Sequence, residues 1–110
     1  MKTPEGYEKA EIDKYLEAIG AYVVKPATFG YGKSGVPDRV FCYRGRFGAI
    51  EVKREGKQPT KLQEMRIKEI QQHGGVAFWG TANKVLAELT EWRLDIDVCE
   101  AVASKGAKRA

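Results

Sequence analysis

The chain has 110 residues, which is the length of a single domain. Hydrophobic residues make up 43% of it and charged residues 31%, so we expect a soluble globular protein with a small core. No apolar run approaches the roughly 20 residues that span a bilayer. The N-terminal segment MKTPEGYEKAE also lacks the apolar stretch of a signal peptide, so we expect a cytoplasmic protein. The net charge of +4 is as compatible with a polyanionic partner as with none.

The first third of the chain predicts a helix, a short strand and a loop. A helix is expected over residues 5–19, because apolar residues recur there at helical spacing and Gly20 follows as a stop. The residues of this apolar stripe are Ile12, Tyr15, Leu16 and Ile19. A short strand is expected over residues 21–25. Residues 26–37 hold three glycines and two prolines, which predicts a loop.

The remaining segments predict a hairpin and then helices alternating with a strand. Residues 38–43 and 47–53 are rich in β-forming side chains, which predicts two paired strands joined by a tight turn. After a polar loop over 54–59, Thr60 opens a T-x-x-Q capping box before a helix over 61–73. A strand over 76–80 and a helix over about 82–92 follow. We assign no element to 93–110 and expect a frayed basic tail over 104–110.

The order of these elements predicts an α/β fold in which helices pack on a mixed sheet. One domain would cover residues 1–110, with its core over about 5–92.

The predicted hairpin gathers three charged residues at its open end. Side chains alternate between the faces of a strand, so Glu51 and Lys53 share a face. If Arg44-Gly45 forms the turn, Asp38 lies opposite Glu51; a turn shifted by one residue would place Asp38 opposite Lys53. Either register brings two carboxylates close together, and Mg²⁺ or Mn²⁺ would offset their repulsion. A solvated charged surface is the alternative interpretation.

The same residues carry a resemblance to known nucleases. Pro37-Asp38, followed after the turn by Glu51-Val52-Lys53, resembles the motif of PD-(D/E)xK nucleases. The segments GVPDRV, GRFGAIEVKREGKQPTKLQ and HGGVAFWG are similar to the virus-type replication-repair nuclease (VRR-NUC) family. The resemblance covers roughly residues 5–90. It implies a restriction-endonuclease-like fold and metal-dependent hydrolysis of phosphodiester bonds.

The resemblance also implies roles for individual residues. Asp38, Glu51 and a glutamate of the first helix would bind the metal ion, together with the backbone carbonyl of Val52. Lys53 would position or deprotonate the attacking water, or neutralise charge in the transition state. Gln63 fits the glutamine that completes the family motif.

Two of these assignments have alternatives. Glu5, Glu8 and Glu11 compete as the first-helix ligand. We choose Glu8, because it precedes Ile12 by four residues and so lies on the core-facing stripe; its alternative role is that of an acid favoured by the helix dipole. Gln63 is also the N3 residue of the capping box, and we expect it to serve only one of the two roles.

The expected partner is DNA. The basic residues predicted to contact it are Lys33, Arg39, Arg54, Lys57 and Lys61. Small stand-alone members of the family resemble Holliday-junction resolvases, act as homodimers and are typically of phage origin, which implies a homodimer acting on branched DNA.

Aromatic residues beyond the needs of a small core would support such a dimer: Phe29, Tyr31, Trp79 and Trp92. Two other classes of function remain open. One is a non-catalytic basic module that binds nucleic acid. The other is a nuclease that cuts flaps, ends or linear duplex.

Overall fold

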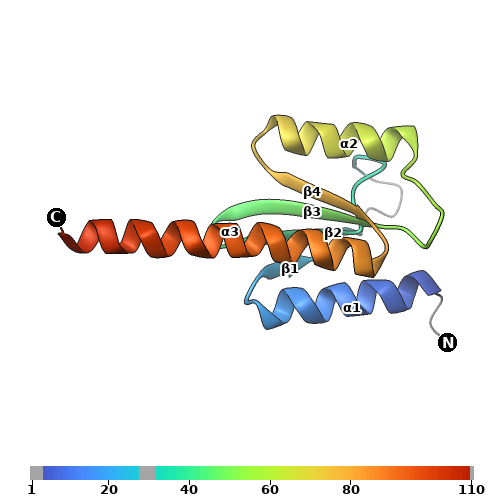
Figure 1. Ribbon diagram of the computed structural model, residues 1–110. Coiled ribbons are helices and arrows are strands. Elements are labelled where there is room, and N and C mark those ends of the chain that lie inside the picture. Colours follow the sequence, from blue (N-terminus) through green and yellow to red (C-terminus); the bar gives the residue numbers. More distant parts are fainter. Residues whose placement is uncertain (1–3, 28–31, 110) are drawn as a thin grey trace.

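The computed structural model describes residues 4–27 and 32–109, which form seven elements (Figure 1). In chain order they are α1 (Pro4–Ala18), β1 (Tyr22–Val24), β2 (Arg39–Tyr43), β3 (Arg46–Val52), α2 (Lys61–Gln72), β4 (Val76–Gly80) and α3 (Ala82–Arg109). Every predicted helix and strand is present, and the boundaries differ by at most one residue everywhere except at the end of α3. Within the described part of the chain, no helix combines the length and apolar character required to span a membrane.

The four strands form one mixed sheet in the order β1-β2-β3-β4. β1, β2 and β3 are antiparallel neighbours, whereas β3 and β4 are parallel and are joined through α2. Helices α1 and α3 contact each other and pack together, while α2 lies on the opposite side of the sheet (Figure 1). The sheet flanked by helices confirms the predicted α/β class.

The turn of the β2–β3 hairpin decides between the two registers. Arg44 has a φ of 48° and Gly45 a φ of 82°, and two successive positive values are those of a two-residue turn suited to the twist of a hairpin. Tyr43 therefore pairs with Arg46, as in the first register. The ladder continues to the pair of Arg39 and Ile50, so Asp38 comes level with Glu51, one residue before β2 begins.

The hydrophobic core lies between the sheet and the pair of helices α1 and α3. Its fully buried side chains come from these helices and from one face of β2 and β3. The largest are Phe41, Ile12, Leu16, Ile50, Leu89, Val52 and Val85. The Trp92 ring packs edge-on against Phe41 and Phe78 at centroid distances of 5.8 and 6.1 Å. Trp92 is therefore part of the core and does not provide spare surface for a partner.

Helix α3 is much longer than expected. It runs for 28 residues, so the prediction of a helix ending near residue 92 and of a frayed tail over 104–110 is wrong for residues up to 109. Ile96 extends the buried stripe by one more turn. Beyond it, the helix continues past the edge of the sheet (Figure 1).

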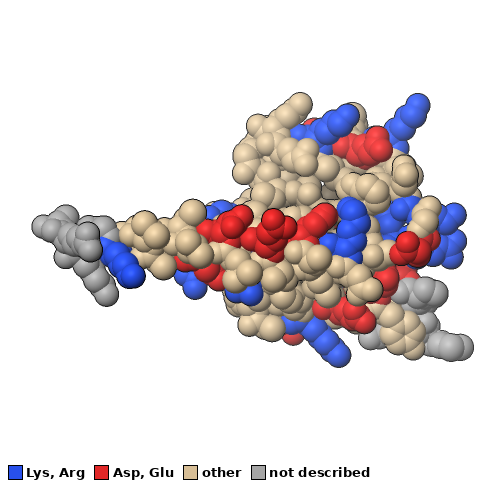
Figure 2. Space-filling model, in the orientation of Figure 1, with Lys and Arg blue, Asp and Glu red and all other residues tan. Residues whose placement is uncertain are grey.

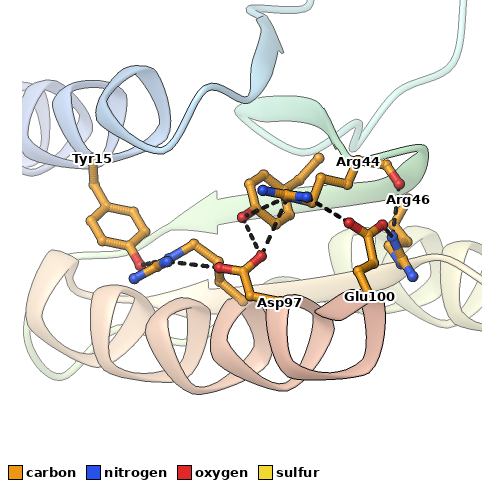
Figure 3. A network of polar contacts seen from close by, with 7 residues as sticks. Tyr15, Arg44, Arg46, Asp97 and Glu100 are labelled. Atoms are coloured by element: carbon orange, nitrogen blue, oxygen red, sulfur yellow. Dashed lines mark hydrogen bonds and ion pairs between the residues drawn. The ribbon is translucent and has the colours of Figure 1, made fainter. Parts of the chain in front are cut away.

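Polar contacts to the hairpin hold the second half of α3 (Figure 3). The Tyr43 hydroxyl donates to Asp97 Oδ1 at 2.6 Å. The guanidinium groups of Arg44 and Arg46 each donate to Glu100 at 2.6 Å. These partners are separated by more than 50 positions in the chain, so no local sequence pattern could reveal that the helix continues.

Candidate active site

Glu51 is the penultimate residue of β3, and its side chain faces α2. The side chain is only 3% exposed. Its Oε1 accepts a hydrogen bond from Gln63 Nε2 at 3.0 Å. Its Oε2 is buried and has no hydrogen-bond partner within the described residues. Buried polar atoms are nearly always paired, so an unpaired carboxylate oxygen indicates a position for a ligand.

Asp38 lies beside Glu51 and joins the two strands at the open end of the hairpin through a hydrogen bond. Its Oδ2 accepts a hydrogen bond from the backbone N–H of Val52 at 2.8 Å, and its Oδ1 lies 3.4 Å from Lys9 Nζ. The motif residues Asp38, Glu51, Val52 and Lys53 therefore meet at one end of the sheet.

The two carboxylates affect each other's protonation. Burial and the negative charge of Asp38 together raise the pKa of Glu51 to about 8, against the opposing effect of Lys53. Lys53 Nζ lies 3.8 Å from Glu51 Oε1. Without a metal ion beside it, Glu51 therefore holds a proton at neutral pH. A divalent ion would displace that proton, since a nearby positive charge favours the ionised form.

Lys9 is a member of this cluster that sequence reasoning missed. It lies on α1, next to Glu8, and its ammonium group reaches Asp38. The only signal in the sequence was its position beside a predicted site residue. The sequence alone did not reveal that α1 passes the open end of the hairpin.

Gln63 serves both of the roles that the sequence suggested, which corrects the expectation of a single role. Its Oε1 accepts a hydrogen bond from Thr60 N at 2.8 Å and its backbone N–H donates to Thr60 Oγ1, which together form the capping box of α2. Its Nε2 donates to Glu51. An amide has an acceptor at one atom and donors at the other, so one side chain can bind both partners.

Glu8 lies near the same end of the sheet but points to another group. Its Oε2 accepts a hydrogen bond of 3.3 Å from the backbone N–H of Ala82, at the start of α3. Glu8 thus stands at a helix N-terminus, though not at that of its own helix. Among residues 4–27 and 32–109, no three His, Cys, Asp or Glu side chains lie close enough together to hold a metal ion. The choice of Glu8 as a ligand stays a prediction.

The predicted DNA contacts divide into one buried residue and four exposed ones. The Arg39 guanidinium turns toward α1, where Nε and Nη2 donate to the Asp13 carboxylate at 2.6 and 3.0 Å. Arg39 is 8% exposed and holds α1 to the sheet, so we remove it from the set of DNA contacts. The four exposed residues are Lys33, Arg54, Lys57 and Lys61.

The donor atoms at the open end of the hairpin suit a divalent ion. Mg²⁺ and Mn²⁺ prefer oxygen ligands, and the site offers two carboxylates, one of which has a buried oxygen without a partner. Two lysines beside these carboxylates, Lys9 and Lys53, reduce their repulsion.

A mixed sheet that carries Asp38, Glu51 and Lys53 together at one end defines the restriction-endonuclease-like class of nucleases. No family model matches the sequence, and no curated protein does. A solved structure described as a "VRR_NUC domain" has a similar fold, with a TM-score of 0.71 and 28% identity, over 82% of this chain and 97% of that one. This shared fold confirms the resemblance to the VRR-NUC family that was seen in the sequence.

Proposed function

We propose that this protein is a metal-dependent nuclease that hydrolyses phosphodiester bonds in DNA. The observation that carries the proposal is the buried Glu51 carboxylate, whose Oε2 has no partner in the described structure, beside Asp38 and Lys53. A protein that needed these groups only for folding would gain stability by pairing or replacing them.

Asp38 and Glu51 would hold Mg²⁺ or Mn²⁺, with Glu8 and the Val52 carbonyl as further ligands. When bound, such an ion polarises the scissile phosphate and lowers the pKa of a water molecule. The protein orients the carboxylates in advance. The Val52 N–H holds Asp38, and Gln63 holds Glu51 while the capping box holds Gln63.

Lys53 supplies positive charge at the reacting group. Its ammonium group lies on the same face as Glu51, within 3.8 Å of the carboxylate. A cation in this position stabilises the negative charge that develops on the phosphoryl oxygens, and it can orient the attacking water.

We propose branched DNA, such as a four-way junction, as the substrate. Lys and Arg side chains gather toward the right of Figure 2, where β3 and β4 end, which suits a polyanion next to the candidate site. Flaps, ends or linear duplex are the alternative substrates. A non-catalytic binding module is the weaker alternative, since it leaves the unpaired Glu51 oxygen without a role. A DNA substrate fits action inside a cell, such as a phage-infected host.

We further propose a homodimer that forms through α3. The aromatic residues that first suggested a dimer do not support it, because Trp92 lies in the core, Trp79 lies beneath Lys84, and Phe29 and Tyr31 fall outside the described residues. Of the exposed apolar side chains of the described residues, three lie along α3 instead: Leu94, Val98 and Val102, which are 49%, 63% and 65% exposed.

A second copy of this chain fits the exposed face of α3. Spacings of four residues place Leu94, Val98 and Val102 on one stripe. Antiparallel pairing about a two-fold axis at Val98 would set Leu94 against Val102 of the other copy. The same axis sets the acidic Glu91 opposite the basic Lys105, so the stripe complements itself in charge as well as in apolar character.

The nuclease is tested by cleavage of a labelled four-way junction, a flap, a linear duplex and a single strand. Each is incubated with Mg²⁺, Mn²⁺ or chelator, using wild type, Asp38→Ala and Lys53→Ala, with Lys14→Ala on the exposed face of α1 as the matched control. We expect paired nicks near the branch point that need metal and are lost only in the two site variants. Cleavage restricted to ends, flaps or duplex would reject junction specificity. Tight binding without cutting under any metal would reject the nuclease.

The dimer is tested by the solution mass of the protein. Val98→Glu places two carboxylates on the two-fold axis and is expected to halve the mass, whereas Val24→Glu, at an exposed position of β1, is expected to leave it unchanged. A monomeric wild type, or a dimer unaffected by Val98→Glu, would contradict this interface.

A further inference from the structure

A basic pocket opens beside the candidate active site, between the loop that follows β3 and the start of α3. Its volume is about 320 Å³. The residues that give it its character are Arg54, Lys57, Trp79, Gly80 and Lys84. We infer that this pocket binds a second phosphate of the DNA strand, next to the one that is cut. The inference rests on the proposed function, because the ligand is the backbone of the same substrate.

The pocket is continuous with the catalytic end of the hairpin. Arg54 directly follows Lys53, whose backbone N–H donates to Gly80 O at 2.8 Å. Trp79 pairs with Glu51 across β3 and β4. A strand whose scissile phosphate lies at Glu51 and Lys53 would therefore have a neighbouring phosphate within reach of the pocket.

Lys84 forms a fixed positive wall of this pocket. Its Nζ lies 2.6 Å from Trp79 O and 3.3 Å from Glu88 Oε1, and 4.1 Å from the centre of the Trp79 ring. Gly80 makes this placement possible: a Cβ there would lie 2.8 Å from Lys84 Cδ, and its φ of +135° also disfavours a side chain. An ammonium group held in place loses little side-chain entropy when a phosphate binds.

Arg54 and Lys57 supply positive charge that no group of the described structure neutralises. Their exposed side chains make no hydrogen bond or ion pair with residues 4–27 or 32–109, although the loop backbone is ordered by a hydrogen bond from Lys57 N to Arg54 O. By contrast, the guanidinium groups at the hairpin turn, Arg44 and Arg46, are both bound to Glu100. Glu55 is the one carboxylate among the residues that line the pocket, so the net charge of this lining is positive.

Side chains rather than helix amides would bind the phosphate. Two of the first three backbone N–H groups of α3 are already taken, since Ala82 N donates to Glu8 and Lys84 N donates to Thr81 Oγ1. Ion pairs between lysine or arginine and phosphates release counterions from DNA, and the salt dependence of binding measures how many such pairs form.

The experiment measures binding of a fluorescent DNA duplex and a four-way junction in EDTA, where no metal-dependent cutting interferes, over a range of salt concentrations. The test variants are Arg54→Gln with Lys84→Met, and Arg54→Gln with Lys57→Gln. The matched control is Lys14→Gln with Lys68→Gln. Like each test pair it removes two positive charges, but at exposed positions of α1 and α2. The second test pair leaves Lys84 in place, so it does not disturb Trp79, and thermal melting checks that every variant is folded.

We expect the slope of log affinity against log salt to become shallower by about 1 in both test pairs, because about 0.9 is lost for the one phosphate that the variant no longer neutralises. The control slope should stay at the wild-type value. Equal losses in test and control pairs, no loss in the test pairs, or no DNA binding by wild type at low salt would each overturn the subsite. Cleavage by wild type is measured separately. If the subsite fails this test, the proposed nuclease activity is unaffected; if wild type never cuts DNA, the proposed nuclease activity is rejected.

Discussion

The two ends of the β2–β3 hairpin differ in how far their charged side chains are paired within the protein. At the turn, Arg44 and Arg46 share the Glu100 carboxylate, and Asp97 accepts from the Tyr43 hydroxyl (Figure 3). These contacts hold the pKa of Glu100 below its usual value, mainly through the hydrogen bond from Arg46. At the open end, Glu51 has a buried oxygen without a partner among the described residues, and its pKa is raised to about 8.

The contrast separates charges that hold the fold together from charges that serve a ligand. Ion pairs at the turn join the hairpin to α3 and require nothing from outside the chain. The carboxylates at the open end destabilise each other, and natural proteins keep such strain chiefly where a substrate or a metal ion relieves it. The following predictions test this division, beginning with the largest expected effect.

Glu51→Gln should stabilise the metal-free protein, and the gain should depend on pH. Because the pKa of Glu51 is raised in the folded state, the wild type loses stability as the pH rises from about 4.5 to about 8 and loses no more above it. The gain of the variant should grow over that window at up to about 1.4 kcal/mol per pH unit, reaching a few kcal/mol. Urea denaturation in EDTA at several pH values measures it. A variant no more stable than wild type at pH 8 would show that Glu51 is not strained.

Arg39→Met should destabilise the protein by about 2 to 3 kcal/mol, because it removes the two short hydrogen bonds to the Asp13 carboxylate and leaves it with the exposed Lys25 ammonium at 3.5 Å. The double variant with Asp13→Asn should recover part of the loss. Urea denaturation gives the stability, and cleavage and DNA binding per folded molecule should stay at the wild-type level. A selective loss of DNA affinity at full stability would restore Arg39 to the DNA contacts.

Glu100→Gln should have the smallest effect. The Glu100 carboxylate is partly exposed and pairs with two arginines at the surface, where ion pairs contribute little to the free energy of unfolding. We expect the melting temperature to fall by about 2 °C or less at low salt, and the difference to shrink as salt is added. A large fall that persists in high salt would mean that the turn network is essential for holding α3.

The sequence predicted the features that depend on local patterns or on a family motif. The hairpin, the capping box and the positions of Asp38, Glu51 and Lys53 follow from spacing, turn residues and resemblance. It could not predict which way a charged side chain turns when its partner is remote. Arg39 looked like a surface cation, yet Asp13, 26 positions away, draws it to α1. The same reason hid Lys9 from the site.

The end of α3 was hidden for a related reason. The partners of Asp97 and Glu100 lie on the hairpin, more than 50 positions earlier in the chain. Gln63 shows a different limit, since sequence treated its two roles as alternatives, whereas the two ends of its amide serve both.

The most direct test of the central claim is calorimetric titration of Mn²⁺ into wild type, Glu51→Gln and Glu100→Gln at pH 6.5, in two buffers of different ionisation enthalpy. The account predicts that wild type and Glu100→Gln bind Mn²⁺ and release close to one proton per site, that the release disappears above about pH 9, and that Glu51→Gln fails to bind. Equal binding by Glu51→Gln, or no binding by wild type, would contradict the claim that the open end of the hairpin is a metal site.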